Sequence, residues 1–226
     1  MNELKVSLSR YVDRRAEILD RCRGRRVLHL GCVGFTDSAV ADKIASAKKS
    51  LHQQVTAIAD CVGVDIDART VGELNQAGVF KNVIVGDVEK LEALPGVLPP
   101  FDVVLAGDII EHLSNPGRML EGVKRHLKPD GRLIVSTPNA MGLPAYLRYT
   151  AGSFREGLQH VLCFNAITLA QMLARHGFVV EEGFSCYQTF TQESSGRAFA
   201  IGRAFFRRFP KFGGTLLFVV RLSCQG

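Results

Sequence analysis

The chain has no tryptophan and no apolar run long enough to form a membrane-spanning helix. Runs such as residues 215–220 fall far short of the roughly 20 apolar residues that cross a bilayer. The first residues lack a charged head followed by an apolar stretch, so we expect no secretory signal. These absences favour a soluble protein.

Cysteine pairs at metal-binding or redox spacing are also missing. No Cys-x-x-Cys motif occurs among the six cysteines, which are Cys22, Cys32, Cys61, Cys163, Cys186 and Cys224. The sequence therefore predicts neither a zinc knuckle nor a disulfide framework. We expect reduced thiols and a cytoplasmic protein.

The remaining composition is that of an ordinary soluble domain, with 46% apolar and 22% charged residues among 226. The net charge is +6, which permits an anionic partner without identifying one. Basic residues gather in two clusters, at residues 14–26 and 197–211. The clusters alone do not predict a nucleic-acid partner.

Short apolar runs that alternate with helical patterns indicate an α/β fold. We expect strands at 26–30, 60–65, 82–86, 101–106 and 132–136, and later strands at 178–187 and 215–222. An amphipathic helix is expected over residues 5–22, and residues 139–163 are expected to be irregular. Strands that alternate with helices form a parallel sheet with helices on both faces, a Rossmann-like doubly wound arrangement.

Small or acidic residues follow the predicted strands at one edge of this sheet, where ligands bind in such folds. They are Gly31, Asp65, Asp87, Asp108 and Thr137. A glycine turn lets backbone N–H groups approach a ligand, and a carboxylate can accept both hydrogen bonds of a ribose diol. The pattern predicts a nucleoside site, although Asp65 and Asp87 would also serve as helix N-caps.

Residues 26–185 resemble class I S-adenosylmethionine-dependent methyltransferases. The nearest branch carries Glu-His after the fourth strand and includes the ubiquinone-pathway O-methyltransferases. The motifs are Val27-Leu-His-Leu-Gly-Cys-Val-Gly34, Gly63-Val-Asp65, Val85-Gly-Asp-Val-Glu89, Phe101-Asp-Val-Val-Leu-Ala-Gly-Asp-Ile-Ile-Glu-His-Leu113, Leu127-Lys-Pro-Asp-Gly-Arg-Leu-Ile-Val-Ser-Thr-Pro-Asn139, His160-Val-Leu-Cys-Phe-Asn165 and His176-Gly-Phe178. Two departures are His29, where the family has an acid, and Val33 and Phe35, where it has glycine.

The resemblance implies one domain over residues 1–226, with a mostly parallel sheet of seven strands and an antiparallel last strand. It implies an N-terminal helix in 1–25, a cofactor-binding half in 26–138 and an acceptor-side half in 139–226, with a variable segment at 190–213. It implies S-adenosylmethionine as cofactor and S-adenosylhomocysteine as product. The cofactor-binding candidates are His29, Gly31, Cys32, Asp65, Ile66, Asp87, Val88 and Asp108.

The candidate catalytic residues are Glu111, His112 and His160. Either histidine could act as a general base near neutral pH, because the imidazole pKa lies in that range. Helical spacing would place Asp108 one turn from Glu111 and His112, and with His160 these side chains could also bind Mg or Mn. We assign no metal ligands, since the acids equally suit the start of a helix.

The sequence leaves the acceptor and the role of residues 197–212 open. The resemblance implies O-methylation of a small-molecule, glycan or natural-product acceptor. Residues 197–212 hold five basic residues, five phenylalanines and no acid, which suits a lid over the active site or a helix at a membrane interface. We favour the lid. An NAD-dependent oxidoreductase and a non-catalytic basic binding module on the same fold are the competing functions.

Overall fold

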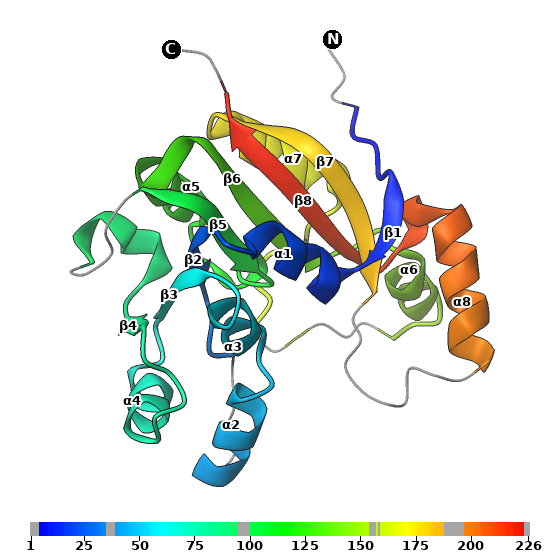
Figure 1. Cartoon of the computed structure of the whole chain (residues 1–226). Coiled ribbons are helices and arrows are strands. Elements are labelled where there is room, and N and C mark those ends of the chain that lie inside the picture. Colours follow the sequence, from blue (N-terminus) through cyan, green and yellow to red (C-terminus); the bar gives the residue numbers. More distant parts are fainter. Residues whose placement is uncertain are drawn as a thin grey trace.

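A computed structural model describes residues 5–34, 39–94, 100–153, 157, 159–187 and 197–223, without the side chains of 197–199. Eight strands form one sheet in the order β1-β7-β8-β6-β5-β2-β3-β4 (Figure 1). The strands are β1 Arg10–Asp13, β2 Arg26–Leu30, β3 Asp60–Asp65, β4 Val83–Val85, β5 Phe101–Gly107, β6 Leu127–Pro138, β7 Phe178–Tyr187 and β8 Thr215–Leu222. Among these strands β8 alone is antiparallel to its neighbours. The predicted Rossmann-like fold with an antiparallel last strand is confirmed.

Helices cover both faces of the sheet. They are α1 Arg14–Cys22, α2 Val40–Ala47, α3 Leu51–Thr56, α4 Ala68–Gln76, α5 Pro116–His126, α6 Leu143–Thr150, α7 Ala166–Arg175 and α8 Arg197–Arg208, with 3-10 turns η1 Val88–Ala93, η2 Ile110–His112 and η4 Pro210–Phe212. Buried residues of α5 and α7 pack on one face, and those of α1 and α3 pack on the other (Figure 1). The central strands are therefore apolar on both sides, as in β5, where Val103 and Val104 belong to opposite cores.

The N-terminal segment corrects one prediction, because residues 10–13 form β1 instead of part of a helix. Strand β1 pairs in parallel with β7 and raises the sheet from seven strands to eight. The Tyr11 ring lies 5.3 Å from that of Tyr187 and 5.1 Å from that of Phe206. These contacts with distant residues, which periodicity cannot reveal, favour the strand over the helix. Helix α1 begins only at Arg14, with Asp13 as its N-cap.

Helix α6 corrects a second prediction, because it lies within residues 139–163, which were expected to be irregular. It is short and begins with Leu143-Pro144, and proline is well tolerated in the first turn of a helix. Gly142 precedes it and lies against the turn before β8, where a Cβ would come within 2.6 Å of the Gly213 carbonyl oxygen. The backbone of α6 is therefore held close to the carboxyl edge of the sheet.

Candidate active site

A cavity of about 710 Å³ opens at the carboxyl edge of the sheet. The segments that follow β2, β3, β4 and β5 all contribute to its wall, and residues 159 and 161 close one side. It is lined by Gly31, Gly34, Asp65, Ile66, Asp67, Asp87, Val88, Glu89, Asp108, Ile109, His112, Leu113, Ser114, Gln159 and Val161. Six of the eight predicted cofactor-binding residues therefore surround one space of a size suited to a nucleoside cofactor.

The glycine turn after β2 needs glycine at two positions. Gly31 has a φ of 64° and Gly34 a φ of 73°, a region that residues with a Cβ rarely adopt. At Gly31 a Cβ would also lie 2.7 Å from Cδ1 of Ile109. Val33, which replaces a family glycine, donates its backbone N–H to Oδ2 of Asp65 at 2.9 Å, so the turn forms without that glycine. Phe35 lies outside the described residues.

Asp65 ends β3 and joins the two sides of the cavity. Its buried carboxylate accepts a second hydrogen bond from the backbone N–H of Asp67 at 3.0 Å. Each oxygen keeps a further lone pair, so the same carboxylate can still accept from a diol. The N-cap of α4 is Asp67, whose side chain accepts from the Thr70 N–H, and not Asp65.

Asp87 is the N-cap of η1 and also lines the cavity. It accepts from the Glu89 N–H at 2.9 Å and pairs with Lys90 at 3.2 Å. Its neighbour Val88 is buried, and Ile66 across the cavity is exposed. These two apolar side chains give the cavity a surface suited to a purine ring.

Asp108 is held by a network that the sequence did not indicate. Its carboxylate pairs with the Arg14 guanidinium at 3.0 Å and accepts from Ser136 Oγ at 2.8 Å, and Arg14 Nε donates to the same Oγ at 2.9 Å. Asp108 has a φ of 51°, the only positive value among the described non-glycine residues. It lies outside η2, so its predicted helical spacing to Glu111 and His112 is wrong.

His29 and Cys32, the other two predicted residues, are not among those that line the cavity. Both side chains are buried, and Cys32 belongs to an apolar cluster with Val71 and Leu74 of α4. His29 Nδ1 lies 3.4 Å from Nδ1 of His52, and burial lowers the pKa of His29 well below its usual value. The geometry therefore favours a core position for His29 over contact with the cofactor.

Glu111, His112 and His160 are brought together, with one ligand atom of each within 4.8 Å of the others. The His112 and His160 rings meet edge to face at 4.8 Å. His112 Nδ1 lies 3.1 Å from the Gln159 carbonyl oxygen. A carbonyl can only accept, so Nδ1 carries the hydrogen and the Nε2 of the neutral ring has a free lone pair. Burial lowers the pKa of His112, which keeps the ring neutral.

Glu111 is the buried acid of this group. Thr137 Oγ1 donates to its Oε2 at 3.0 Å, and its Oε1 has no hydrogen-bond partner. Burial raises the pKa of Glu111 to about 7, so the carboxyl group is half ionised at neutral pH. Together with His160 it lines a second cavity of about 60 Å³, whose wall also includes Arg148 of α6. The space is large enough for a hydroxyl-bearing group.

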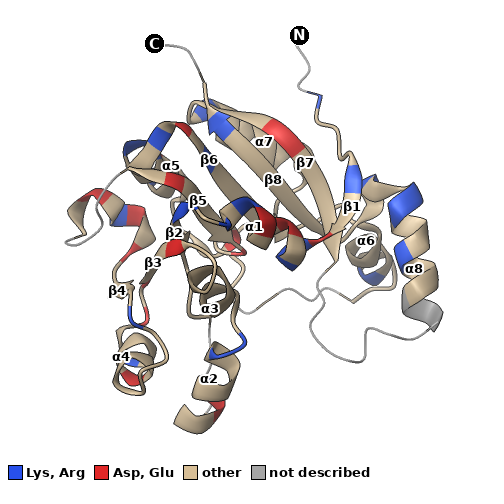
Figure 2. Cartoon of the chain, in the orientation of Figure 1, with Lys and Arg blue, Asp and Glu red and all other residues tan. Residues whose placement is uncertain are grey.

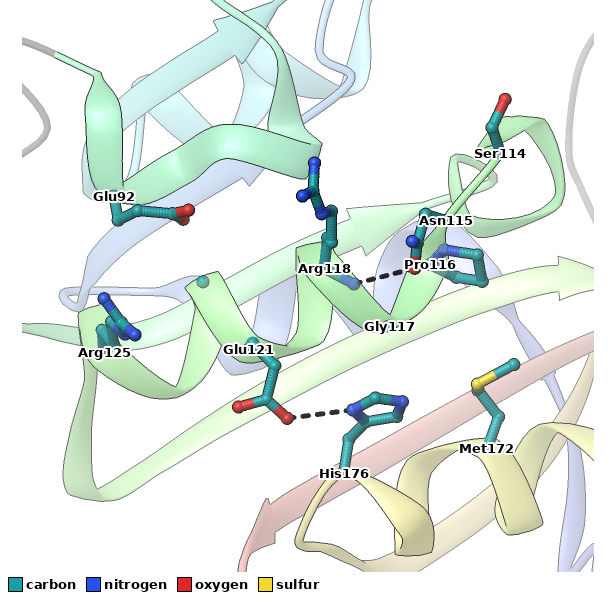
Figure 3. Close-up of a pocket in the computed structure, with 11 residues that line it drawn as sticks. Glu92, Ser114, Asn115, Pro116, Gly117, Arg118, Glu121, Arg125, Met172 and His176 are labelled. Atoms are coloured by element: carbon teal, nitrogen blue, oxygen red, sulfur yellow. Dashed lines mark hydrogen bonds and ion pairs between the residues drawn. The ribbon is translucent and has the colours of Figure 1, made fainter.

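A third cavity, of about 610 Å³, lies between η1, α5 and α7 and is shown in Figure 3. It contains none of the predicted site residues, and its Ser114 also lines the cofactor cavity. His176 and Glu121 form an ion pair at 2.9 Å across it when the imidazole is protonated (Figure 3). None of Glu111, His112 and His160 lines this cavity, so we assign it no catalytic role.

Comparison with known proteins identifies the relatives of this chain. The profile of a methyltransferase domain matches residues 4–182. A probable S-adenosylmethionine-dependent methyltransferase of Mycolicibacterium smegmatis is 29% identical over 162 residues, 72% of this chain and 55% of that protein. A ubiquinone biosynthesis O-methyltransferase of Xylella fastidiosa is 31% identical over 143 residues, 63% of this chain and 52% of that protein. This chain thus spans about half the length of the curated relatives that it matches.

The fold has solved counterparts. The crystal structure of magnesium protoporphyrin IX methyltransferase from Synechocystis, with S-adenosylhomocysteine bound, superposes with a TM-score of 0.54 over 92% of this chain and 81% of that one. The sequence identity is 16%, so this likeness shows the fold alone. Within the described residues, no helix has both the length and the apolar character needed to cross a membrane.

Proposed function

We propose that this chain, which belongs to the methyltransferase domain family and carries an S-adenosylmethionine-dependent methyltransferase domain, methylates an oxygen of a small-molecule or glycan acceptor. The relatives do not support the NAD-dependent oxidoreductase that the sequence left open. The name of the Xylella relative favours O-methylation as the reaction type. The acceptor and the activity of the whole protein are part of the proposal.

The cofactor supplies a methyl group already activated by a sulfonium, so the protein has to align the acceptor and remove its proton. The observation that carries the proposal is the close approach of Glu111, His112 and His160, whose ligand atoms lie within 4.8 Å of one another. A single acceptor oxygen between them would be within hydrogen-bonding reach of more than one. His112 lines the cofactor cavity, whereas Glu111 and His160 line the second cavity beside it.

In this arrangement His112 is the general base. Its Nδ1–H is held by the Gln159 carbonyl, so Nε2 would take the proton of the acceptor hydroxyl while the bound cofactor supplies the methyl group. Protonated Glu111 donates a hydrogen bond that orients the acceptor oxygen. Because this role needs the acid form, the rate should fall as pH rises through about 7.

A divalent cation is the second candidate, favoured by the unpartnered Oε1 of Glu111. Two imidazoles and one carboxylate suit a cation such as Mn, and the three residues would hold it. It would lower the pKa of the acceptor hydroxyl. Asp108 is not a ligand in this set, because Arg14 and Ser136 hold its carboxylate. This version needs the ionised form of Glu111, and a bound cation would itself favour that form by lowering the pKa of the carboxyl group.

The test is release of S-adenosylhomocysteine with a panel of phenol, catechol and sugar acceptors. If His112 is the general base, His112→Gln should lower kcat by about 100-fold or more, and the variant should still bind S-adenosylhomocysteine. The control is His126→Gln, which removes a buried histidine of α5 outside both cavities. Glu111→Gln should abolish the pH dependence near 7. Full turnover in His112→Gln would exclude this base, and loss of activity with a chelator would favour the cation.

A further inference from the structure

We propose that α6, α8 and η4 form a surface that docks on an anionic membrane. The surface, named here the α6–α8 face, consists of Met141, Tyr146, Leu147, Ile201, Phe205 and Phe209 together with the cations around them. All six side chains are among the exposed large hydrophobic residues of the described chain. Single exposed apolar residues are common, but six in and beside α6 and α8 are more typical of an interaction surface.

Helix α8 is attached to the sheet by one side only. The Phe206 ring packs on Tyr11 of β1, and the Arg203 guanidinium lies 5.9 Å from the centre of the Tyr187 ring. Ile201 and Phe205 lie one turn apart on another side of the helix, and Phe209 follows its last residue, with exposures of 72%, 38% and 38%. An apolar stripe thus remains in contact with solvent after the helix has packed.

Helix α6 continues this stripe. Met141, Tyr146 and Leu147 are 65%, 57% and 56% exposed. The start of α6 lies against the turn between η4 and β8, as the short Gly142 contact shows. Met141 and Lys211 of η4 line one shallow cavity, which places the segment before α6 beside η4. In the view of Figure 1, α6 and α8 appear on the same side of the molecule, near β1, and α8 contacts β1 and η4.

The charge of the face has one sign. Residues 139–153 and 197–223 contain no acid, and Arg148, Arg207, Arg208 and Lys211 are exposed there. Figure 2 shows blue bands on α6 and α8 without red. Apolar and aromatic side chains flanked by cations fit a lipid surface, where the rings enter the acyl boundary and the cations meet phosphates. A second copy of the same face would bring like charges together, which disfavours a dimer.

The position of α8 argues against the lid that the sequence favoured. None of its described residues lines the cofactor cavity or the smaller cavity beside Glu111. Helix α6, in contrast, contributes Pro144, Ala145 and Arg148 to that smaller cavity. If the proposed function holds, docking would bring the acceptor cavity close to the lipid. The docking itself does not depend on methyl transfer and is testable without an acceptor.

The experiment is sedimentation of the full chain with vesicles of phosphatidylcholine containing about 30% phosphatidylglycerol, beside vesicles of pure phosphatidylcholine. We expect binding to the anionic vesicles at low salt and release at high salt, because screening weakens the attraction. Phe205→Ser with Phe209→Ser, and separately Arg207→Gln with Arg208→Gln, should each weaken binding by about tenfold or more. The two arginines are exposed, whereas the Phe205 and Phe209 rings also contact each other and Phe212, so the fold of each variant is checked by thermal melting.

The matched control is Arg23→Gln with Arg25→Gln, which removes two exposed arginines beside β2 outside the face. It should change binding by less than about twofold. Absence of binding by the wild-type chain, or equal loss in this control, would overturn the proposal. So would a dimer that the Phe variants convert to monomers without vesicle binding, or binding to an oligonucleotide but not to vesicles. Vesicle binding without any turnover would leave the docking intact and contradict only the proposed function.

Discussion

The buried histidine pair beneath the cofactor cavity should make the fold sensitive to acid. Burial lowers the pKa of His52 to about 4, from 6.5, and lowers that of His29 as well. The native state therefore binds fewer protons than the unfolded chain between about pH 4 and 6.5, so stability is lost as pH falls through that window. The pKa shift of His52 contributes about 3 kcal/mol to the free energy of unfolding when the pH is above both pKa values. About 2 kcal/mol of this contribution is lost between pH 7.5 and pH 5.

The assay is urea unfolding at pH 7.5 and pH 5 for the wild type and His52→Gln. The variant cannot take up this proton, so its loss of stability over the interval should be smaller by about 2 kcal/mol. Val55→Ala removes a buried, non-titrating side chain of the same helix α3 and should lower stability equally at both pH values. If His52→Gln and the wild type lost the same free energy of unfolding between the two pH values, the argument that burial keeps this histidine neutral would be refuted.

Three further predictions concern the walls of the cofactor cavity. Asp65→Ala should weaken S-adenosylhomocysteine binding by about 1.5–3 kcal/mol in calorimetric titration, and unchanged affinity would remove its assignment to ribose. Gly31→Ala should lower Tm more than Gly34→Ala, since both have positive φ but only the first meets a side chain; equal melting shifts would contradict this. Arg14→Met should lower the free energy of unfolding by about 1–3 kcal/mol, measured with urea. Because Arg14 and Asp108 interact directly, the double variant with Asp108→Asn should lose less than the sum of the two single losses.

The part of the site that depends on local pattern could be predicted from the sequence. Apolar strands that end in Gly31, Asp65 and Asp87 are local signals, and these residues do meet at one cavity. Glu111, His112 and His160 were named together as catalytic candidates, and one ligand atom of each lies within 4.8 Å of the others, although η2 is a single 3-10 turn.

What the sequence could not show depends on contacts between distant segments. Arg14 reaches Ser136 across 122 residues, and no spacing rule connects them. Strand β1 is stabilised by its edge position beside β7, which overrides its helical periodicity. His29 occupies a strand position whose burial follows from helix α3 packing over it. Of the variable segment predicted at 190–213, residues 190–196 lie outside the described residues.

The network around Asp108 has a practical consequence for where the domain can be cut. The motifs that resemble the methyltransferase family begin at residue 26, and an expression design based on them alone would discard Arg14. Asp108 would then keep its strained backbone and its hydrogen bond to Ser136 but lose its cation at the cavity wall. The cut would also remove Ile18 and Cys22 of α1 from the core, so a negative result in a cofactor-binding screen would say nothing about the intact chain. Designs intended for ligand discovery should retain β1 and α1 in full.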